Sequence, residues 1–304
     1  MKSIIIYFSQ TGNTEKVAKA IQKRVKQAAG HCDIVKIKDA NPRRLHEYDL
    51  IGIGCPVIGF VETGNVRAFI NDMRFVGGKH AFPFATHGTR PEFFFPSIVP
   101  RLKRRGLIVI GMYNCYADVR MGGRPRTSPY PTAGHPDEID LKEAEEFGRE
   151  MVERSRRISA GETGLIPPLP KWAEFNVREY QEKRAVREME LGVPEEAAKR
   201  YIRRPLKFQK EKCTYPECWL CMDNCPMEGI DLTVEPPIIG KPCMTCSVCM
   251  QICPTGAIGR GGAPQAVTPP EVHKAVFAEF YLAPLAKAEA EGRFRRLVPV
   301  EDTG

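Results

Sequence analysis

The chain has 304 residues, which is more than one core of average size needs, and two domains are therefore expected. Hydrophobic residues make up 42% and charged residues 27% of it, which fits a globular protein and excludes a disordered one. No apolar run approaches the roughly 20 residues of a membrane-spanning helix, and the apolar start is too short for a signal peptide. We therefore expect a cytoplasmic protein without membrane insertion.

The formal net charge of +8 favours acidic partners through long-range attraction. The basic residues of 178–212 alternate with glutamates, a pattern that is typical of a solvated helix surface and disfavours nucleic acid as the partner. These glutamates are Glu179, Glu182, Glu188, Glu190, Glu195 and Glu196.

Short apolar segments alternate with amphipathic helical patterns through the first 160 residues. In chain order they predict a strand at 3–9, a helix at 14–29, strands at 33–38 and 50–54, a helix at 65–72, a strand at 81–85, a helix at 96–105, a strand at 107–112 and a helix at 137–158. This alternation predicts an α/β fold, a five-stranded parallel sheet covered on both faces. The stretch 113–136, rich in Gly, Pro and Arg, is expected to be a long functional loop.

A proline-rich segment after residue 160 interrupts the alternation and indicates a domain boundary. We expect an α/β domain over 1–160 and a linker with charged helices over 161–206. A small cysteine-rich domain over 207–263 and a helical tail over 264–304 follow.

Eight of the 11 cysteines crowd into 41 residues of the chain. Thiols stay reduced in the cytoplasm, so such crowding predicts metal binding rather than disulfides. The cysteines form two runs, Cys213-x4-Cys218-x2-Cys221-x3-Cys225-Pro226 and Cys243-x2-Cys246-x2-Cys249-x3-Cys253-Pro254.

The second run matches the bacterial ferredoxin pattern, in which three cysteines bind one [4Fe–4S] cube and the fourth, before a proline, binds the neighbouring cube. On that rule the runs exchange their last ligands. The first cluster takes Cys213, Cys218, Cys221 and Cys253, and the second takes Cys243, Cys246, Cys249 and Cys225.

Two alternatives stay open for the cysteines. Paired zinc sites also use Cys-x2-Cys, although zinc needs neither the third cysteine nor the Cys-Pro ending of each run. The first run has four residues between its first two cysteines where the pattern has two, so Cys213 is either a ligand or a free thiol beside a three-ligated cluster.

A hydroxyl-rich loop follows the first predicted strand and leads directly into a helix. It consists of Ser9, Gln10, Thr11, Gly12, Asn13 and Thr14. Backbone N–H groups and the helix dipole would meet there and suit a dianionic phosphate, while an ordinary helix cap by Thr11 or Asn13 is the alternative.

The loop resembles the phosphate loop of flavodoxins, and the likeness covers about the first 160 residues. The resemblance implies sheet order 2-1-3-4-5 and an FMN whose ring lies between the loops after the third and fourth strands. Phe60 is the nearest substitute for a ring-stacking aromatic, or else a core residue. Cys55 is interpreted as a packing residue, and His87 as a surface histidine or a flavin donor. The ring-loop residues are Pro56, Val57, Ile58, Gly59, Phe60, Thr86, His87, Gly88 and Thr89.

Most of the chain resembles flavodoxin–ferredoxin fusions of anaerobes, with a flavodoxin-like domain joined to a small ferredoxin-like α+β domain. That resemblance implies low-potential electron transfer between two [4Fe–4S] clusters and FMN, with an unidentified redox partner protein. A flavoenzyme fed by the clusters is one alternative, and the loop 113–136 with Arg120, Arg124 and Arg126 would then bind an anionic substrate. A metal-stabilised scaffold for an acidic partner is another, and a homodimer is a further hypothesis.

Overall fold

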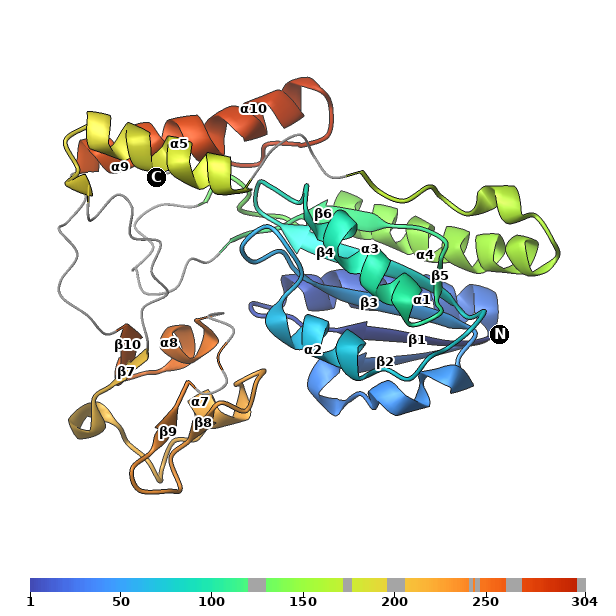
Figure 1. The fold of residues 1–304 in the computed structure, drawn as a ribbon, viewed down its shortest axis with the longest axis horizontal. Helices are drawn as coiled ribbons and strands as arrows, with labels where there is room; N and C mark the ends of the chain where they lie inside the picture. Colours follow the sequence, from blue (N-terminus) through green and yellow to red (C-terminus); the bar gives the residue numbers. More distant parts are fainter. Residues whose placement is uncertain are drawn as a thin grey trace. The chain divides into compact units, whose positions relative to one another are not determined.

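In the computed structural model of the chain, a parallel sheet of largely buried strands forms the centre of the N-terminal half (Figure 1). Its strands are β1 (Lys2–Tyr7), β2 (His31–Lys36), β3 (Leu50–Pro56), β4 (His80–His87), β5 (Ile108–Val109) and β6 (Tyr113–Tyr116). They lie in the order β2-β1-β3-β4-β5, with β6 also paired to β4, and every pair is parallel. The predicted flavodoxin-like fold is confirmed.

The structure describes residues 1–119, 130–171, 177–195, 206–240, 243, 247–260 and 270–299. They divide into two compact units. The first unit holds 1–119 and 132–171, and the second holds 130–131 together with the described residues from 177 onward.

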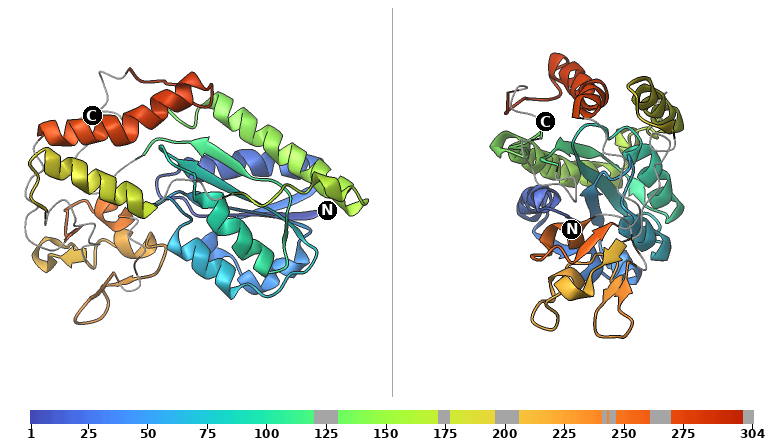
Figure 2. Two further views of the ribbon diagram at one scale, coloured as in Figure 1. Left: turned by 45° about the horizontal axis from the view of Figure 1, so that its top comes forward. Right: turned by 90° about the vertical axis from the view of Figure 1, so that its left-hand side faces the viewer.

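Helices cover both faces of the sheet, because strands as apolar as β3 and β4 must be shielded from water on both sides (Figures 1 and 2). One face carries α1 and α4, which pack against each other, and the other carries α2 and α3. The bounds are α1 (Asn13–Ala29), α2 (Gly64–Asp72), α3 (Phe94–Arg104) and α4 (Glu138–Ser159), with short 3₁₀ turns η1 (Ile37–Asp39), η2 (Pro42–Glu47) and η3 (Thr163–Leu165). All four predicted helices are therefore present.

The fifth position of the sheet differs from the prediction of one strand over 107–112. Val109 pairs with Ala81, and Tyr113 pairs with Phe84. Between these two pairs the edge chain advances by four residues while β4 advances by three. The extra residue is a bulge that divides the edge into β5 and β6. The assignment of 113–116 to a loop was wrong, because the chain rejoins the ladder after the bulge and carries the edge strand on beside the end of β4.

The second unit is built from short elements around the cysteines and a pair of longer helices. Its elements are α5 (Val177–Glu190), β7 (Leu206–Phe208), η4 (Lys210–Lys212), α7 (Leu220–Asp223), β8 (Ile230–Asp231), β9 (Ile238–Ile239), α8 (Val248–Ile252), β10 (Ile258–Arg260), α9 (Pro270–Phe277), the π-helical turn η5 (Ala278–Leu282) and α10 (Ala283–Ala290). The strand β7 pairs antiparallel with β10, and β8 with β9. Helix α5 lies alongside α9 (Figure 2). An ion pair between Arg187 of α5 and Glu279 of η5, with side chains 3.3 Å apart, joins α5 to the turn that follows α9.

None of the helices in the described part of the chain combines the length and the apolar character that crossing a membrane would need.

Close packing of α4 on α1 depends on a glycine. A Cβ added at Gly148 would lie 2.6 Å from the backbone oxygen of Ile21, an atom that cannot swing aside. We expect Gly148→Ala to lower the free energy of unfolding by about 1–3 kcal/mol in urea denaturation followed by circular dichroism, despite alanine's better helix propensity. Gly164→Ala is the control, because nothing lies within 4 Å of its added Cβ. Equal stability of the two variants would contradict this account of the packing.

Candidate functional site

The predicted phosphate loop lies at the carboxyl end of β1 and turns directly into α1. Gly12 adopts the left-handed conformation, with φ of 92°, and its N–H donates to the Ser9 hydroxyl at 3.1 Å. Among the described residues no side chain caps α1. The cap by Thr11 or Asn13 is therefore absent, and the first-turn N–H groups point out of the helix end where an anion is stabilised.

Two residues of this loop make contacts that tie it to the rest of the fold. The Asn13 side-chain amide donates to the backbone oxygen of Asp118 at 2.9 Å. The Thr14 hydroxyl is buried and lies 2.7 Å from the hydroxyl of Thr86, at the end of β4. Thr14, the last residue of the predicted phosphate loop, thus joins this loop to the second ring loop.

The two predicted ring loops follow neighbouring parallel strands and are hydrogen-bonded to each other. Val57 N–H donates to the Thr86 carbonyl at 2.8 Å, and Ile58 N–H to the Val61 carbonyl at 3.2 Å. Gly59 and Phe60 form the tip between these last two residues, with φ of 63° and 74°. Two successive positive φ values are typical of the tight turn of a two-residue hairpin.

Phe60 packs edge-to-face against Phe93 with ring centroids 6.4 Å apart. It therefore joins the first ring loop to Phe93, the residue that precedes α3. A half-buried aromatic side chain of this kind can present its remaining surface to a ligand.

His87 is buried, with 4% of its surface exposed, so its interpretation as a surface histidine was wrong. Its Nε2 lies 3.0 Å from the Asn114 side-chain oxygen, and its ring lies 4.5 Å from the Tyr116 ring. Both partners belong to β6, the strand that the sequence pattern did not reveal.

A buried ion-pair cluster behind the first ring loop was not predicted. The Glu62 side chain is fully buried and lies 3.0 Å from the guanidinium of Arg67 and 3.0 Å from that of Arg101. Arg67 is on α2 and Arg101 on α3, so the carboxylate fixes the loop to both helices. A single glutamate before a helix resembles any surface residue, and only the burial identifies it.

A polar cluster at the start of α4 is explained by helix capping. Asp137 caps the helix and forms a capping box with Asp140, whose carboxylate also accepts from Nδ1 of His135 at 2.5 Å. The side chains of His135, Asp137 and Asp140 each offer one possible metal-ligand atom, and these atoms lie within 4.8 Å of one another. All three side chains already take part in the hydrogen bonds around the helix cap.

Cys55 lies at the end of β3 and is completely buried, as expected of a packing residue. Burial raises the pKa of its thiol to about 12, against the opposing effect of hydrogen bonds from Thr63. Burial likewise raises the pKa of the Cys32 thiol to about 12. Neither residue can act as a thiolate near neutral pH.

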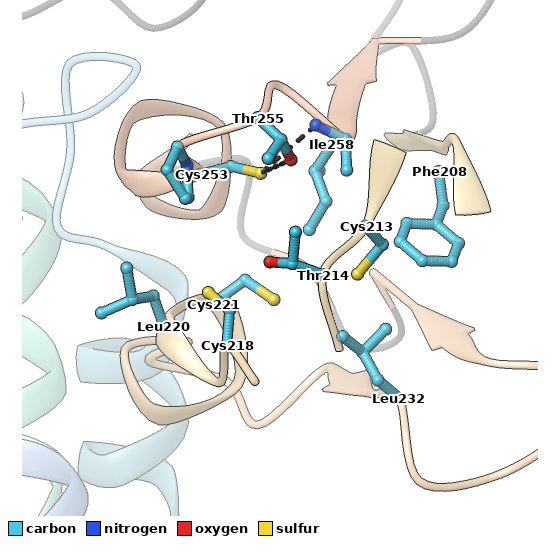
Figure 3. A pocket seen from close by; sticks show the side chains of 12 residues that line it. Phe208, Cys213, Thr214, Cys218, Leu220, Cys221, Leu232, Cys253, Thr255 and Ile258 are labelled. Carbon is cyan, nitrogen blue, oxygen red and sulfur yellow. Dashed lines mark hydrogen bonds between the residues drawn. The ribbon is translucent and has the colours of Figure 1, made fainter. Parts of the chain in front are cut away.

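The four cysteines assigned to the first cluster line one pocket in the second unit (Figure 3). Cys213, Cys218 and Cys221 come from the first run, and Cys253 comes from the end of the second. The rest of the wall is mainly apolar and is formed by Phe208, Thr214, Leu220, Leu232, Pro254, Thr255, Ala257 and Ile258.

The donor set of this pocket consists of four cysteine sulfurs from two separate runs of the chain. Thiolates are the ligands of iron–sulfur clusters as well as of structural zinc sites. The residues present therefore fit an iron–sulfur cluster.

The thiols around the pocket influence one another. The pKa of Cys221 is raised to about 11, first by burial and then by its neighbours Cys213, Cys253 and Cys218. Burial acts to raise the pKa of Cys253 too, but hydrogen bonds from Thr255 and from backbone N–H groups outweigh it and lower the value. Cys253 thus lies in a turn that favours the thiolate, the form that binds metal.

Three of the four cysteines assigned to the second cluster are described, and Cys246 lies outside the described residues. Cys249 is buried in the same apolar core as Cys221, and Cys225 packs against that core. Cys243 is exposed. The loop residues Arg120, Arg124 and Arg126 also lie outside the described part of the chain.

Part of the chain is similar to flavodoxins, and a shorter part is similar to ferredoxins. Residues 4–91 match the family model of a flavodoxin domain. A flavodoxin of Megasphaera elsdenii is 32% identical over 110 residues, covering 35% of this chain and 80% of that protein. An uncharacterized protein of Methanocaldococcus jannaschii is 28% identical over 160 residues, covering 50% of this chain and 99% of that protein. A ferredoxin of Methanothermococcus thermolithotrophicus is 40% identical over 50 residues, covering 16% of this chain and 83% of that protein.

The raised thiol pKa values lead to a prediction for alkylation of iron-free native protein with iodoacetamide at pH 8. At a pKa of about 12, Cys32 and Cys55 hold roughly a thousandfold less thiolate than a thiol at the ordinary value of 9.0. We expect mass spectrometry to find both unmodified while the exposed Cys243 reacts. Denatured protein, in which all three react, is the control, and rapid native labelling of Cys55 would refute its burial.

Proposed function

The N-terminal half of this chain belongs to the flavodoxin family, and from that premise we propose that the protein transfers electrons between a bound FMN and two [4Fe–4S] clusters. FMN would bind on the loop Ser9–Thr14, with its ring at the loops Pro56–Phe60 and Thr86–Thr89. The relay would serve a redox partner protein in anaerobic metabolism.

The observation that carries the proposal is the convergence of the first-cluster cysteines on one pocket. Cys253 follows Cys221 by 32 residues, yet both line it. Ferredoxins with two clusters exchange the cysteine before proline between their cubes, and the pocket is consistent with that exchange. Cys213 lines the same pocket, which supports its role as a ligand despite the longer spacing that follows it.

The flavin half of the proposal is supported by the free end of α1. Gly12, which no L-residue replaces without strain at φ of 92°, lets the backbone turn its N–H groups towards one spot. Ser9 holds the turn from within, and Thr11 is exposed at its tip. The residues thus fit a phosphate through backbone donors and hydroxyls.

When bound, FMN supplies the conversion between one- and two-electron transfer, and the clusters supply single-electron steps. The chain's own residues hold these groups and keep water from them. The apolar pocket wall, with Phe208 and Leu232 beside the cysteines, would lower the local dielectric around the first cluster. The Thr14–Thr86 contact would hold the phosphate loop beside the second ring loop, and the Phe60–Phe93 contact would hold the first ring loop against the start of α3.

The two halves make separable predictions that cofactor analysis under anaerobic conditions can test. We expect about eight iron atoms, eight sulfides and one FMN per chain, with the visible spectrum of both cofactors. Cys221→Ala should lose about half of the iron and keep FMN. Thr11→Ala, at an exposed position, should weaken FMN retention and keep the iron.

The measured metals and reactions distinguish the proposed relay from its alternatives. Zinc without iron or sulfide would favour the scaffold, and loss of all iron in Thr11→Ala would show that the variants merely unfold the chain. Reduced protein that turns over a small molecule would favour the flavoenzyme alternative. Reduction of other redox proteins alone would favour the relay.

A further inference from the structure

The two Cys-Pro turns of the cysteine-rich module have the same backbone, which allows one to serve as an internal reference for the other. The N–H of Gly229 donates to Sγ of Cys225 at 3.3 Å, and the N–H of Ala257 donates to Sγ of Cys253 at 3.2 Å. The residue before each donor has positive φ, 51° at Glu228 and 65° at Gly256. Differences between the turns therefore lie in their side chains.

One difference is a hydroxyl that only one of the two turns carries. The Thr255 Oγ1 lies 3.6 Å from Sγ of Cys253, within hydrogen-bond reach of a sulfur atom (Figure 3). Met227 occupies the matching position after Cys225 and has no hydroxyl. A cysteine bound to iron carries no proton, so the Thr255 hydroxyl must be the donor.

The second difference is in charge. The turn at Cys225 carries Glu228 and Asp231, whereas the turn at Cys253 has Gly256 and Gly259 at the same two positions. The Asp231 carboxylate accepts from the N–H and the hydroxyl of Thr233, and these bonds lower its pKa and keep it ionised. Two negative charges thus accompany one Cys-Pro turn and none accompanies the other.

We propose that these turns divide the two clusters into a high-potential and a low-potential site, and that the first cluster, bound through Cys253, is reduced first. This inference rests on the proposed function. A donor to a ligand sulfur stabilises the reduced cluster, which carries one more negative charge. A nearby carboxylate opposes that charge. The hydroxyl raises the reduction potential of the first cluster, and the carboxylates lower that of the second. Both effects therefore widen the difference between the two potentials.

The division assigns a role to each site in the relay. An electron rests on the first cluster, and the second cluster is the site that delivers or receives it at lower potential. Thr255, Glu228 and Asp231 act on the potentials through the cysteines or through space and are positioning and tuning residues rather than ligands.

The test is a potentiometric titration of the intact protein followed by electron paramagnetic resonance of the reduced clusters. We expect two separate reduction steps in the wild type. Thr255→Val should lower the equilibrium constant of the higher step roughly three- to tenfold, or about 30–60 mV at 59 mV per tenfold change. Thr255→Ser, which keeps the hydroxyl, should restore the wild-type value. Thr255 is exposed, so none of these changes disturbs the core.

The matched variants act on the other turn. Met227→Thr and the pair Glu228→Gln and Asp231→Asn should each raise the lower step and leave the higher one in place. The effect of the two carboxylates should shrink at high salt, since exposed charges are screened, whereas that of Thr255 should persist.

The possible outcomes separate this inference from the proposed function. One unresolved step for both clusters, or a shift of the lower step by Thr255→Val, would overturn the inference while leaving the relay intact. Absence of any reduced [4Fe–4S] signal would instead overturn the proposed function.

Discussion

Burial of the central strands on both faces is the constraint on which the first unit depends. All eight residues of β4 are buried, and so are six of the seven in β3. Strands of this kind need helices above and below, and the crossover connections that parallel strands require supply those helices. The carboxyl ends of β1, β3 and β4 therefore meet at one edge. The parallel arrangement of these strands therefore places the phosphate loop and both ring loops at the same edge, whatever the sequences of the loops.

The contacts that hold this edge together are polar and buried. The Thr14 and Thr86 hydroxyls join the phosphate loop to the end of β4, and Glu62 fixes the first ring loop to α2 and α3. A buried carboxylate between two guanidinium groups is costly to desolvate, and its worth lies in specifying one arrangement of its neighbours. Loops held by such contacts would suit the proposed FMN, because a cofactor that changes charge is best served by surroundings that need not reorganise.

The second unit obeys a different constraint. Its strands have only two or three residues each, and its apolar core includes Cys221 and Cys249 themselves. So small a module buries little apolar surface, and metal ligation commonly supplies the stability that such a core lacks. The paired Cys-Pro turns place Cys225 and Cys253, two of the proposed ligands, at matching positions, and the side chains around them make the two positions chemically unequal.

The sequence by itself determined the secondary-structure elements that depend on local pattern, and it predicted the site residues. Period and spacing predicted the parallel sheet, its four helices, the phosphate loop and the eight cysteines with their exchange of ligands, because turns, caps and metal motifs are written in adjacent residues. The ligand sets remain an assignment from spacing, to which the structure adds the meeting of Cys213, Cys218, Cys221 and Cys253 at one pocket.

Only the tertiary structure decided the features that depend on contacts between residues distant along the chain. The bulge that divides β5 from β6 exists in register with β4, and the burial of His87 depends on Asn114 and Tyr116 in that strand. Glu62 can be buried as an ion-pair partner only because α2 and α3 place Arg67 and Arg101 beside it. Such effects arise from residues distant along the chain, and no local pattern carries them.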